Sequence, residues 1–393
     1  MIYRSFQEKQ LSLLGFGAMR LPLLEDGAID EQQVFRMVAY AAEHGVNYFD
    51  TAYPYHGGLS EIVLGRALKQ LPRESYYLAT KYPGHQIATT YDPADVFEEQ
   101  LRKCEVDYFD FYLLHNVYEN SLDTYLDPRW GIIPYFLEQK KAGRIKHLGF
   151  STHAHMDCLQ QFLQEAGQHM EFCQIQMNYL DWSVQQAQEK IALLQDYNIP
   201  VWVMEPVRGG KLAALSEEAT TLLEAAAPGR TAADWALRWQ IDKPVTVVLS
   251  GMSNMAQVEE NCATFEAEAP LSAAEDALLY QVAESMKNGV PCTACRYCCD
   301  SCPLGLDIPL LMNIANEVRV APSFNAGMTI DALGEGKRPQ DCLACGACAA
   351  ACPQSINIPE VLAQTVTAME GVPHWADLCK QREEAARKLR EGN

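Results

Sequence analysis

The sequence of 393 residues predicts an α/β protein, with a (β/α)8 TIM barrel followed by a small, cysteine-rich α-helical domain. Two observations predict this architecture. Short apolar segments alternate with amphipathic helical stretches over the first 270 residues, as strands and crossover helices do in a parallel sheet. Nine of the fourteen cysteines then crowd between Cys292 and Cys352. We therefore expect two domains, residues 1–270 and residues 271–393.

Eight segments of the first domain have the length and apolar character of buried strands. They are Leu14–Gly17, Asn47–Asp50, Tyr76–Lys81, Phe109–His115, His147–Ser151, Phe172–Met177, Pro200–Met204 and Thr246–Leu249. Eight β/α units in about 250 residues fit a closed (β/α)8 barrel. A doubly wound sheet is the alternative, but no G-x-G-x-x-G follows the first strand, which disfavours a Rossmann fold.

The composition is that of a globular protein, with 48% apolar and 21% charged residues. No stretch approaches the roughly 20 apolar residues that span a bilayer, and the first residues hold no apolar signal core. We therefore expect a cytoplasmic protein with no membrane partner. The formal net charge of −20 disfavours nucleic-acid binding, because an acidic surface repels phosphates. Such a surface suits a redox partner with a basic docking face, although it is also common in plain enzymes.

Two cysteine runs dominate the second domain. Both have the spacing C-x2-C-x2-C-x3-C-P, the first from Cys292 to Pro303 and the second from Cys342 to Pro353. Three thiolates at this spacing can surround one face of a cubane, and the doubled motif resembles the bacterial two-cluster ferredoxins. A pair of zinc sites is the alternative. Zinc commonly takes two C-x2-C pairs, so the three-plus-one grouping before proline fits two [4Fe–4S] clusters better.

The resemblance implies crossed ligation, since the cysteine before proline binds the other cluster in two-cluster ferredoxins. The implied ligands are Cys292, Cys295, Cys298 and Cys352 for one cluster, and Cys342, Cys345, Cys348 and Cys302 for the other. Cys299 is an extra thiol, which we expect to be a bystander unless a shift of the loop lets it replace Cys298.

The segment between the runs is far longer than a compact ferredoxin needs. Ile308–Val318 follows the first run and has apolar residues at helical spacing. Ile358–Leu362 repeats the pattern after the second run. The second domain therefore resembles the α-helical ferredoxins more than the small β-hairpin type.

Polar side chains stand where predicted barrel strands end, which is where barrel enzymes carry their active sites. They include Asp50, Lys81 and His115, and Tyr55 follows in the second βα loop. A tyrosine has a pKa near 10, which a nearby ammonium lowers, while a carboxylate keeps that lysine charged. Such a tyrosine can donate a proton to a carbonyl oxygen, and the histidine can hydrogen-bond the same oxygen. Each residue alone would be explained by a structural role, but their joint placement at strand ends indicates an acid–base site.

These residues lie in segments that resemble the aldo/keto reductase family over residues 12–263. The resemblance rests on Leu14–Pro22, Phe49–Glu61, Ala79–Lys81 and Tyr112–His115, of which the second matches an Asp-Thr-Ala-x-x-Tyr signature. It implies that Tyr55 is the proton donor and that Lys81 and Asp50 tune it. It also implies that His115 orients the substrate carbonyl. Tyr53 is a second tyrosine in the signature, but the spacing from Asp50 favours Tyr55.

The family holds a nicotinamide cofactor without a Rossmann fold, so the resemblance implies NAD(H) or NADP(H). The implied contacts are Gly17, Met19, Arg20, Ser151, Gln174, Met204, Pro206, Gly209, Gly210, Lys211, Ser250, Gly251, Met252, Gln257 and Asn261. Met204 stands where many members stack a tyrosine on the nicotinamide. Gly251 and Gln257 stand where NADPH-specific members have a lysine and an arginine. The choice between the two cofactors is therefore open, with Arg208 or Lys211 as substitutes for the missing cations.

The leading hypothesis is an oxidoreductase that interconverts a small carbonyl compound and an alcohol with NAD(P)H, while its clusters exchange electrons with a redox protein. This combination resembles the ferredoxin-fused branch of the aldo/keto reductases. Nicotinamide transfers a hydride whereas a cluster accepts one electron, so a flavin would ordinarily mediate, but no flavin motif is evident. Two alternatives are an ordinary carbonyl reductase with structural clusters and an electron-transfer subunit whose barrel is a docking scaffold.

Overall fold

The computed structural model describes residues 1–286, 289–290, 292 and 294–391. The chain divides into two compact units. The first, here the barrel unit, comprises Met1–Leu278 together with the residues from Arg382 onward, and the second, the cysteine unit, comprises Leu279–Gln381. The domain boundary after residue 270 stays a prediction beside this division. Among the described residues, no helix has the length and apolarity needed to cross a membrane.

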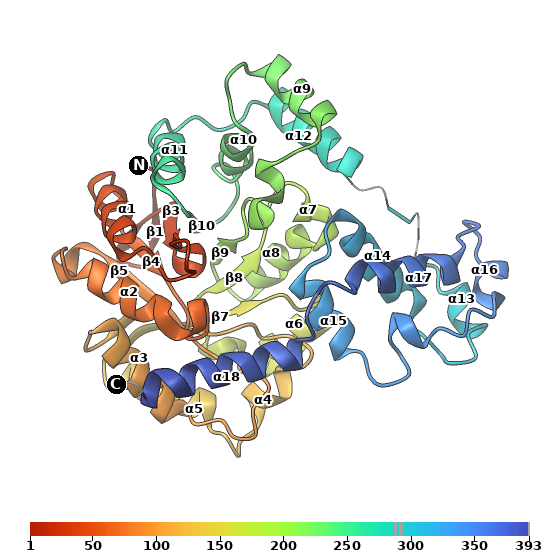
Figure 1. Cartoon of the computed structure of the whole chain (residues 1–393), viewed down its shortest axis with the longest axis horizontal. Helices are drawn as coiled ribbons and strands as arrows, with labels where there is room; N and C mark the ends of the chain where they lie inside the picture. The colour runs from red at the N-terminus through yellow and green to blue at the C-terminus, as the bar shows by residue number, and fades with distance from the viewer. Residues whose placement is uncertain (287–288, 291, 293, 392–393) are drawn as a thin grey trace. The chain divides into compact units, whose positions relative to one another are not determined.

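Eight parallel strands close into a barrel in the order β10-β3-β4-β5-β6-β7-β8-β9 (Figure 1). Their bounds are β3 Leu14–Gly17, β4 Tyr48–Asp50, β5 Tyr77–Tyr82, β6 Phe109–Leu114, β7 Ile145–Thr152, β8 Cys173–Gln176, β9 Val201–Met204 and β10 Val247–Gly251. The barrel closes where Val248 of β10 pairs with Leu14 of β3. The predicted (β/α)8 fold is therefore confirmed, and all eight predicted strands are present with small shifts at their ends.

Helices surround these strands, as crossovers between parallel strands require (Figure 1). They are α1 Glu31–Glu43, α2 Leu59–Leu68, α3 Pro93–Cys104, α4 Leu122–Leu126, α5 Ile132–Lys141, α6 Met156–Ala166, α7 Asp181–Val184, α8 Ala187–Asp196, α9 Glu217–Ala226, α10 Ala232–Trp239 and α11 Met255–Glu266. Short 3-10 turns, η1 Ala18–Arg20, η2 Tyr55–Gly58 and η5 Arg208–Ala213, follow three of the strands.

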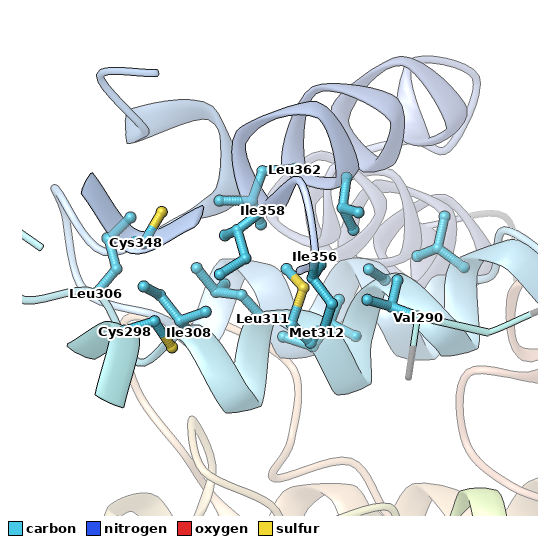
Figure 2. Packing of buried hydrophobic residues seen from close by; sticks show 14 of the residues in the cluster. Val290, Cys298, Leu306, Ile308, Leu311, Met312, Cys348, Ile356, Ile358 and Leu362 are labelled. Atoms are coloured by element: carbon cyan, nitrogen blue, oxygen red, sulfur yellow. The ribbon is translucent and has the colours of Figure 1, made fainter. Parts of the chain in front are cut away.

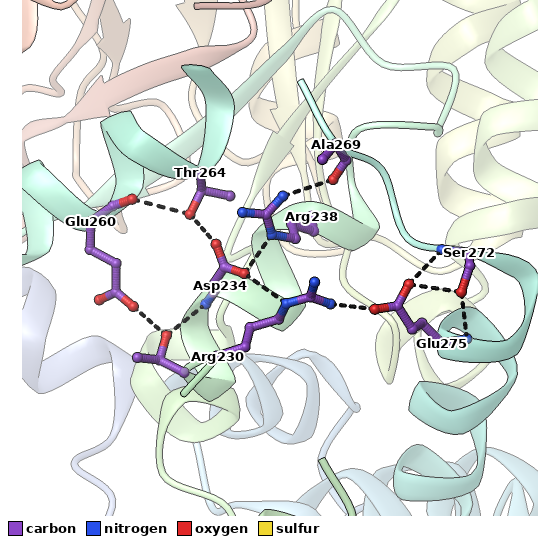
Figure 3. A network of polar contacts seen from close by, with 9 residues as sticks. Arg230, Asp234, Arg238, Glu260, Thr264, Ala269, Ser272 and Glu275 are labelled. Carbon is purple, nitrogen blue, oxygen red and sulfur yellow. Dashed lines mark hydrogen bonds and ion pairs between the residues drawn. The ribbon is translucent and has the colours of Figure 1, made fainter. Parts of the chain in front are cut away.

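A polar network fixes the last helices of the barrel unit (Figure 3). Asp234 of α10 accepts hydrogen bonds from Arg238 on its own helix and from Thr264 on α11. Arg230 contacts Asp234 at 3.4 Å and Glu275 at 2.6 Å, and Glu275 lies in the first turn of α12 (Ala273–Met286). One carboxylate thus holds together the loop before α10, α10 itself and α11.

A two-stranded hairpin, β1 Tyr3–Phe6 and β2 Lys9–Ser12, precedes the barrel and was not predicted. Phe6 packs on Phe111 and Trp202, with ring centroids 5.5 and 5.1 Å apart. Phe6 also meets His147, near the start of β7. The hairpin therefore covers the amino ends of the strands, and the opposite end remains for function.

The cysteine unit is helical, which confirms the predicted α-helical second domain. Its helices are α13 Tyr297–Asp300, α14 Ile308–Val320, α15 Phe324–Ala332, η6 Pro339–Asp341, α16 Ala347–Ala350 and α17 Ile358–Met369, and α18 Trp375–Glu391 runs on into the barrel unit. Ile308, Met312 and Ile358 form its core together with the thiols of Cys298 and Cys348 (Figure 2). The core of this unit is thus built directly against two of the predicted ligands.

Candidate functional site

The predicted catalytic residues come together at the carboxyl ends of neighbouring strands. Asp50 ends β4, Lys81 lies near the end of β5 and His115 follows β6, while Tyr55 begins η2. Asp50 is 3% exposed and Lys81 is 1% exposed. Strand pairing aligns Asp50 with Ala79 of β5 and Lys81 with Leu113 of β6. Asp50, Lys81 and His115 therefore occupy adjacent positions around the barrel mouth.

A chain of hydrogen bonds connects three of these residues. The Nζ of Lys81 donates to the Asp50 carboxylate, to the Thr51 carbonyl oxygen at 2.8 Å and to the Tyr55 hydroxyl at 3.4 Å. The second oxygen of Asp50 accepts from Gln174 Nε2 at 2.9 Å. The lysine is therefore fixed by a charge and a carbonyl, with its remaining donor aimed at Tyr55.

His115 lies beside Tyr55. Its ring meets the Tyr55 ring edge-on, with centroids 5.8 Å apart, and its Nδ1 is buried without a hydrogen-bond partner among the described residues. His85, from the loop after β5, packs on His115 with centroids 4.2 Å apart. His85 was not among the predicted residues, since a loop histidine has no recognisable spacing.

Burial and charge set the protonation of this site. Burial raises the pKa of the Tyr55 hydroxyl, and the Lys81 charge only partly opposes this. The ammonium lowers this pKa, as the sequence predicts, but burial has the larger effect. The pKa of Lys81 is raised because Asp50 and Tyr55 outweigh its burial, so it stays charged. Burial lowers the pKa of His115 well below its usual range, so its imidazole is neutral at pH 7.

A buried glutamate holds the loop and the strands in place. Glu61 of α2 accepts from Thr80 Oγ1 at 2.6 Å and from Gln100 Nε2 at 2.7 Å. It also pairs with Lys103 Nζ at 2.8 Å. Gln100 in turn donates to the Lys81 carbonyl oxygen at 3.0 Å. Glu61 therefore ties α2 and α3 to the strand that carries Lys81.

The structure separates the two tyrosines of the signature. The Tyr53 hydroxyl donates to Glu99 of α3 at 3.1 Å and accepts from Arg390 Nη2 at 2.8 Å. Lys81 reaches the hydroxyl of Tyr55 instead. Tyr53 thus belongs to the attachment of the last helix, α18, and Tyr55 to the strand-end cluster.

Three of the predicted cofactor residues converge at another part of the barrel mouth. A Cβ at Gly209 would lie 3.0 Å from Arg20 Nη2, and one at Gly251 would lie 3.4 Å from the Arg20 side chain. Gly209 and Gly210 have φ values of 62° and 93°, in the left-handed region that favours glycine. An exposed guanidinium beside backbone without side chains offers a cradle for an anionic group such as a phosphate.

Other predicted cofactor residues form hydrogen bonds within the protein. Asn261 Nδ2 donates to Ser250 Oγ at 3.0 Å, and the Asn116 backbone N–H donates to Ser151 Oγ at 2.8 Å. The remaining predicted cofactor residues lie along the same strands and loops. Pro206 and Met252 are buried, Met204 is half-buried, and Gly17 lies against the Ser250 carbonyl. Met19, Gly210 and Lys211 are exposed.

Two candidate phosphate contacts are already engaged. Gln257 Oε1 accepts from the Ser253 backbone N–H at 2.7 Å, at the start of α11. The buried Arg208 pairs with Asp181 at 3.1 Å. Lys211 and Arg20 are both exposed and carry positive charge at the surface.

The eight predicted cluster ligands line two separate cavities of the cysteine unit. One cavity has Cys292, Cys295, Cys298 and Cys352 in its wall, and the other has Cys302, Cys342, Cys345 and Cys348. Each set combines three thiols of one run with the last thiol of the other. Among the described residues, no three His, Cys, Asp or Glu side chains are close enough together to bind one metal ion. The thiolates around a cubane are farther apart than those around a single zinc ion. Cys299 is half-buried and lines neither cavity.

The two cysteine runs have matching backbones. Ala294 and Ala344 have φ values of 53° and 52°, and the residues after the second cysteines, Arg296 and Gly346, have φ values of 66° and 76°. A short helix and a longer helix follow in each run, as the element order shows. The repeated motif is therefore also a repeated structure.

A closed eight-stranded barrel with a buried lysine–carboxylate–tyrosine chain, joined to paired cysteine cavities, defines an oxidoreductase with an iron–sulfur module. The model of the aldo/keto reductase family matches residues 13–284, and that of a 4Fe-4S dicluster domain matches residues 291–357. The chain belongs to the aldo/keto reductase family and carries a 4Fe-4S dicluster domain after the barrel.

Named relatives agree with this assignment. The chain is 28% identical over 282 residues to the L-galactose dehydrogenase of Arabidopsis thaliana, covering 65% of this chain and 84% of that protein. It is 27% identical over 204 residues to the NADH-specific methylglyoxal reductase of Escherichia coli, covering 48% of this chain and 60% of that enzyme. A 150-residue match to the probable aldo-keto reductase 1 of Glycine max, at 31% identity, spans 36% of this chain and 42% of the soybean protein.

Solved structures give the same fold. An aldo-keto reductase from Bacillus halodurans in its holo form superimposes with a TM-score of 0.58 at 27% identity. The match covers 72% of this chain and 96% of that structure. The part of the chain outside the match is of the size expected for the cysteine unit.

Proposed function

We propose that the barrel unit interconverts a small carbonyl compound and an alcohol with NAD(H) or NADP(H), and that the cysteine unit holds two [4Fe–4S] clusters that exchange single electrons with a redox protein. The observation that carries the first part is the hydrogen-bonded chain Asp50–Lys81–Tyr55 beside His115. A phenol linked to a fixed ammonium is a proton donor, and a neutral imidazole next to it can hydrogen-bond the same oxygen.

Each residue has a defined role in this reaction. Tyr55 transfers its hydroxyl proton to the carbonyl oxygen in reduction and takes it back in oxidation. Lys81 stabilises the phenolate that remains, and Asp50 keeps that lysine charged and in place. His115 orients the carbonyl. A bound nicotinamide supplies the hydride for the new C–H bond, and the cradle at Arg20, Gly209 and Gly251 fits its phosphates.

The choice between the two nicotinamides is part of the proposal. The E. coli relative is described as NADH-specific. Gln257 brings no positive charge, and its side-chain oxygen is bonded to Ser253. Arg208 is held by Asp181. We therefore favour NADH, with Arg20 and Lys211 as the cations that an NADPH phosphate would have to use.

The iron–sulfur part rests on the two cavities. Each offers four thiols from two runs, which suits the three-plus-one ligation of two-cluster ferredoxins. Clusters bound there supply one-electron transfer. Anaerobic purification followed by iron and sulfide analysis should give about eight of each per chain, as two cubanes require, and mass spectrometry of released cofactors identifies any nicotinamide or flavin.

The Tyr55→Phe variant tests the catalytic part. Loss of the proton donor should lower kcat for carbonyl reduction about 10²–10⁴-fold, while iron content stays unchanged. Tyr53→Phe is the matched control, since its hydroxyl contacts Glu99 and Arg390 and not Lys81. Full carbonyl reduction by Tyr55→Phe would show that Tyr55 is not the proton donor, whereas loss of this activity with unchanged function in vivo would support the barrel as a docking scaffold.

The Cys345→Ser variant separates the two enzyme hypotheses. If the clusters are structural, a folded Cys345→Ser protein keeps its NAD(P)H-dependent carbonyl reduction. If they carry electrons for the reaction, the variant loses exchange with a one-electron dye such as methyl viologen, together with any turnover driven by that dye.

A further inference from the structure

The end of α18 is part of the barrel unit, and it lies at the loop that carries Tyr55. Arg390 Nε donates to Glu99 Oε2 at 2.9 Å, and Arg390 Nη2 reaches the Tyr53 hydroxyl at 2.8 Å. Figure 1 shows this end of α18 alongside α3, the helix of Glu99. The last helix of the chain is therefore fixed beside the catalytic loop by charged hydrogen bonds.

Two glycines of the Tyr55 loop allow close packing of α18. Gly57 and Gly58 have φ values of 64° and 94°. A Cβ at Gly57 would meet the Cβ of Ala385 at 3.5 Å, and one at Gly58 would meet Leu389 Cδ1 at 3.3 Å. The two glycines thus let α18 approach their backbone directly.

These contacts fix which face of α18 looks toward the site. Ala385 and Leu389 both face the loop and are half-buried. Arg382 lies three residues before Ala385, on the same helical face, and it is also half-buried. Burial is the main cause that lowers the pKa of His85 and of His115, and the Arg382 charge adds to it; the same charge opposes the burial that raises the pKa of Tyr55. The helical spacing therefore places Arg382 one turn from Ala385, on the face of α18 that packs on the Tyr55 loop.

Two chemically different kinds of group are available to a substrate. The Tyr55 hydroxyl and the His115 ring are the donors for a carbonyl oxygen. His115 stays neutral, because burial and the neighbouring charges lower its pKa. A guanidinium, in contrast, is always charged and binds a carboxylate in a bidentate, charge-assisted geometry.

We propose that Arg382 binds a carboxylate of the substrate, so that the barrel acts on small oxo acids and hydroxy acids in preference to neutral carbonyl compounds. This rests on the proposed function, and it names the substrate class of the same site. The carbonyl lies at Tyr55 and His115, and the acid group lies at Arg382, in the middle of α18. Arg382 is then a specificity residue that the sequence places after the cysteine runs, far from the barrel.

The test compares each oxo acid with its neutral methyl ester in the iron-loaded full-length protein. Pyruvate, 2-oxobutanoate and phenylglyoxylate are assayed with NADH and with NADPH beside their methyl esters. The wild type should have the higher kcat/KM for the acids. Arg382→Gln should lower kcat/KM for the acids about 10- to 100-fold, chiefly through KM, because one charged hydrogen-bonded pair is lost. The loss on the esters should be much smaller than the loss on the acids, because an ester has no carboxylate for Arg382 to bind, and Arg382→Lys should fall between the two proteins on the acids.

Arg387→Gln is the matched control. It removes the same charge from the same helix, but Arg387 is 67% exposed and pairs with Glu391 of its own helix at 3.8 Å. Both substrates should be turned over as in the wild type. A preference of the wild type for esters, or an equal loss on acid and ester in Arg382→Gln, would overturn the inference. An equal acid-specific loss in Arg387→Gln would overturn it as well.

A binding measurement gives a readout beside turnover. Oxamate carries a carboxylate and an unreactive carbonyl, and calorimetry should show about 10- to 100-fold weaker binding to Arg382→Gln than to the wild type or to Arg387→Gln. Equal affinities for all three proteins contradict the inference. If the wild type reduces esters and methylglyoxal but no acid, only the substrate class fails. If it reduces no carbonyl compound with either nicotinamide, the proposed function itself fails.

Discussion

The barrel site and the cysteine cavities differ in how completely the polypeptide alone builds them. In the barrel, Asp50 and Lys81 are almost fully buried and are paired to each other and to Gln174 and Thr51. In the cysteine unit, all eight predicted ligands line two cavities, and two of them, Cys295 and its counterpart Cys345, are exposed. The difference indicates that the barrel site is pre-organised, whereas the cysteine unit is completed by what it binds.

The largest expected effect follows from removing the iron. A bound metal centre contributes its binding free energy to folding, on the order of 10 kcal/mol for small metal domains. The core of the cysteine unit packs against the cavity walls through Cys298, Cys348 and Ile308. Treatment with a chelator and a mild oxidant should therefore unfold this unit, while the barrel unit stays folded.

Limited proteolysis and circular dichroism measure this outcome. Cleavage should appear within Leu279–Gln381, and a fragment containing Met1–Leu278 should persist. The loss of ellipticity should correspond to the helices of the cysteine unit. If the cysteine unit resists proteolysis without iron, its core is stable without the clusters. The contrast with the pre-organised barrel site would then be wrong.

The next largest effect is expected in the barrel. Lys81→Met leaves the Asp50 carboxylate buried with Gln174 as its remaining side-chain donor, which should cost about 3–5 kcal/mol of the barrel's unfolding free energy. Burial already raises the pKa of Asp50, and loss of the ammonium raises it further. The cost should therefore be largest at neutral pH and shrink as pH falls through that raised pKa, where Asp50 is protonated in the folded state.

Urea unfolding followed by tryptophan fluorescence reports this change, since Trp202, Trp235 and Trp239 are buried in the barrel unit. The double variant Asp50→Asn/Lys81→Met is the control, and it should recover most of the loss because no unpaired charge remains. A cost below about 1 kcal/mol in the single variant would mean that the pair behaves like a surface ion pair.

The sequence predicted the parts that depend on local pattern. Apolar segments located all eight barrel strands, and the cysteine spacing located the two runs that line the cavities. The hairpin at Tyr3–Phe6 and Lys9–Ser12 was missed because its short strands are largely polar and their burial depends on the finished barrel. The raised pKa of Tyr55 was missed for a related reason, since burial is a property of the folded site.

Arg382 shows the main limit of sequence reasoning. The stretch after it is rich in charges and reads as a solvated helix, with Arg387, Lys388 and Arg390 close by. Its apolar stripe consists only of Ala385, Ala386 and Leu389, which are half-buried in the structure. Which face meets the barrel is decided by Gly57 and Gly58, more than 300 residues earlier in the chain. A stripe at that spacing predicts a docked helix but cannot identify the surface that receives it.

The smallest expected effect on stability concerns one position at which the two cysteine runs differ. It tests whether the residue there contributes to the backbone conformation of the loop. Gly346 has a φ of 76°, and its counterpart Arg296 has a φ of 66° at the same loop position. A side chain in this region costs about 1–2 kcal/mol relative to glycine. Gly346→Ala should therefore destabilise the cysteine unit by about 1 kcal/mol, and Arg296→Gly should stabilise it by somewhat less, since it also removes an exposed ion pair with Asp307.

Thermal unfolding of the iron-loaded protein, with cluster absorbance as the probe, measures both changes. Opposite signs in the two variants would show that the chain's own conformational preference contributes to the loops around the clusters. If both variants unfold at the wild-type temperature, the bound clusters alone dictate the loop conformation. The cysteine unit would then depend on its metal more completely than its helical core suggests, which would widen the contrast with the barrel.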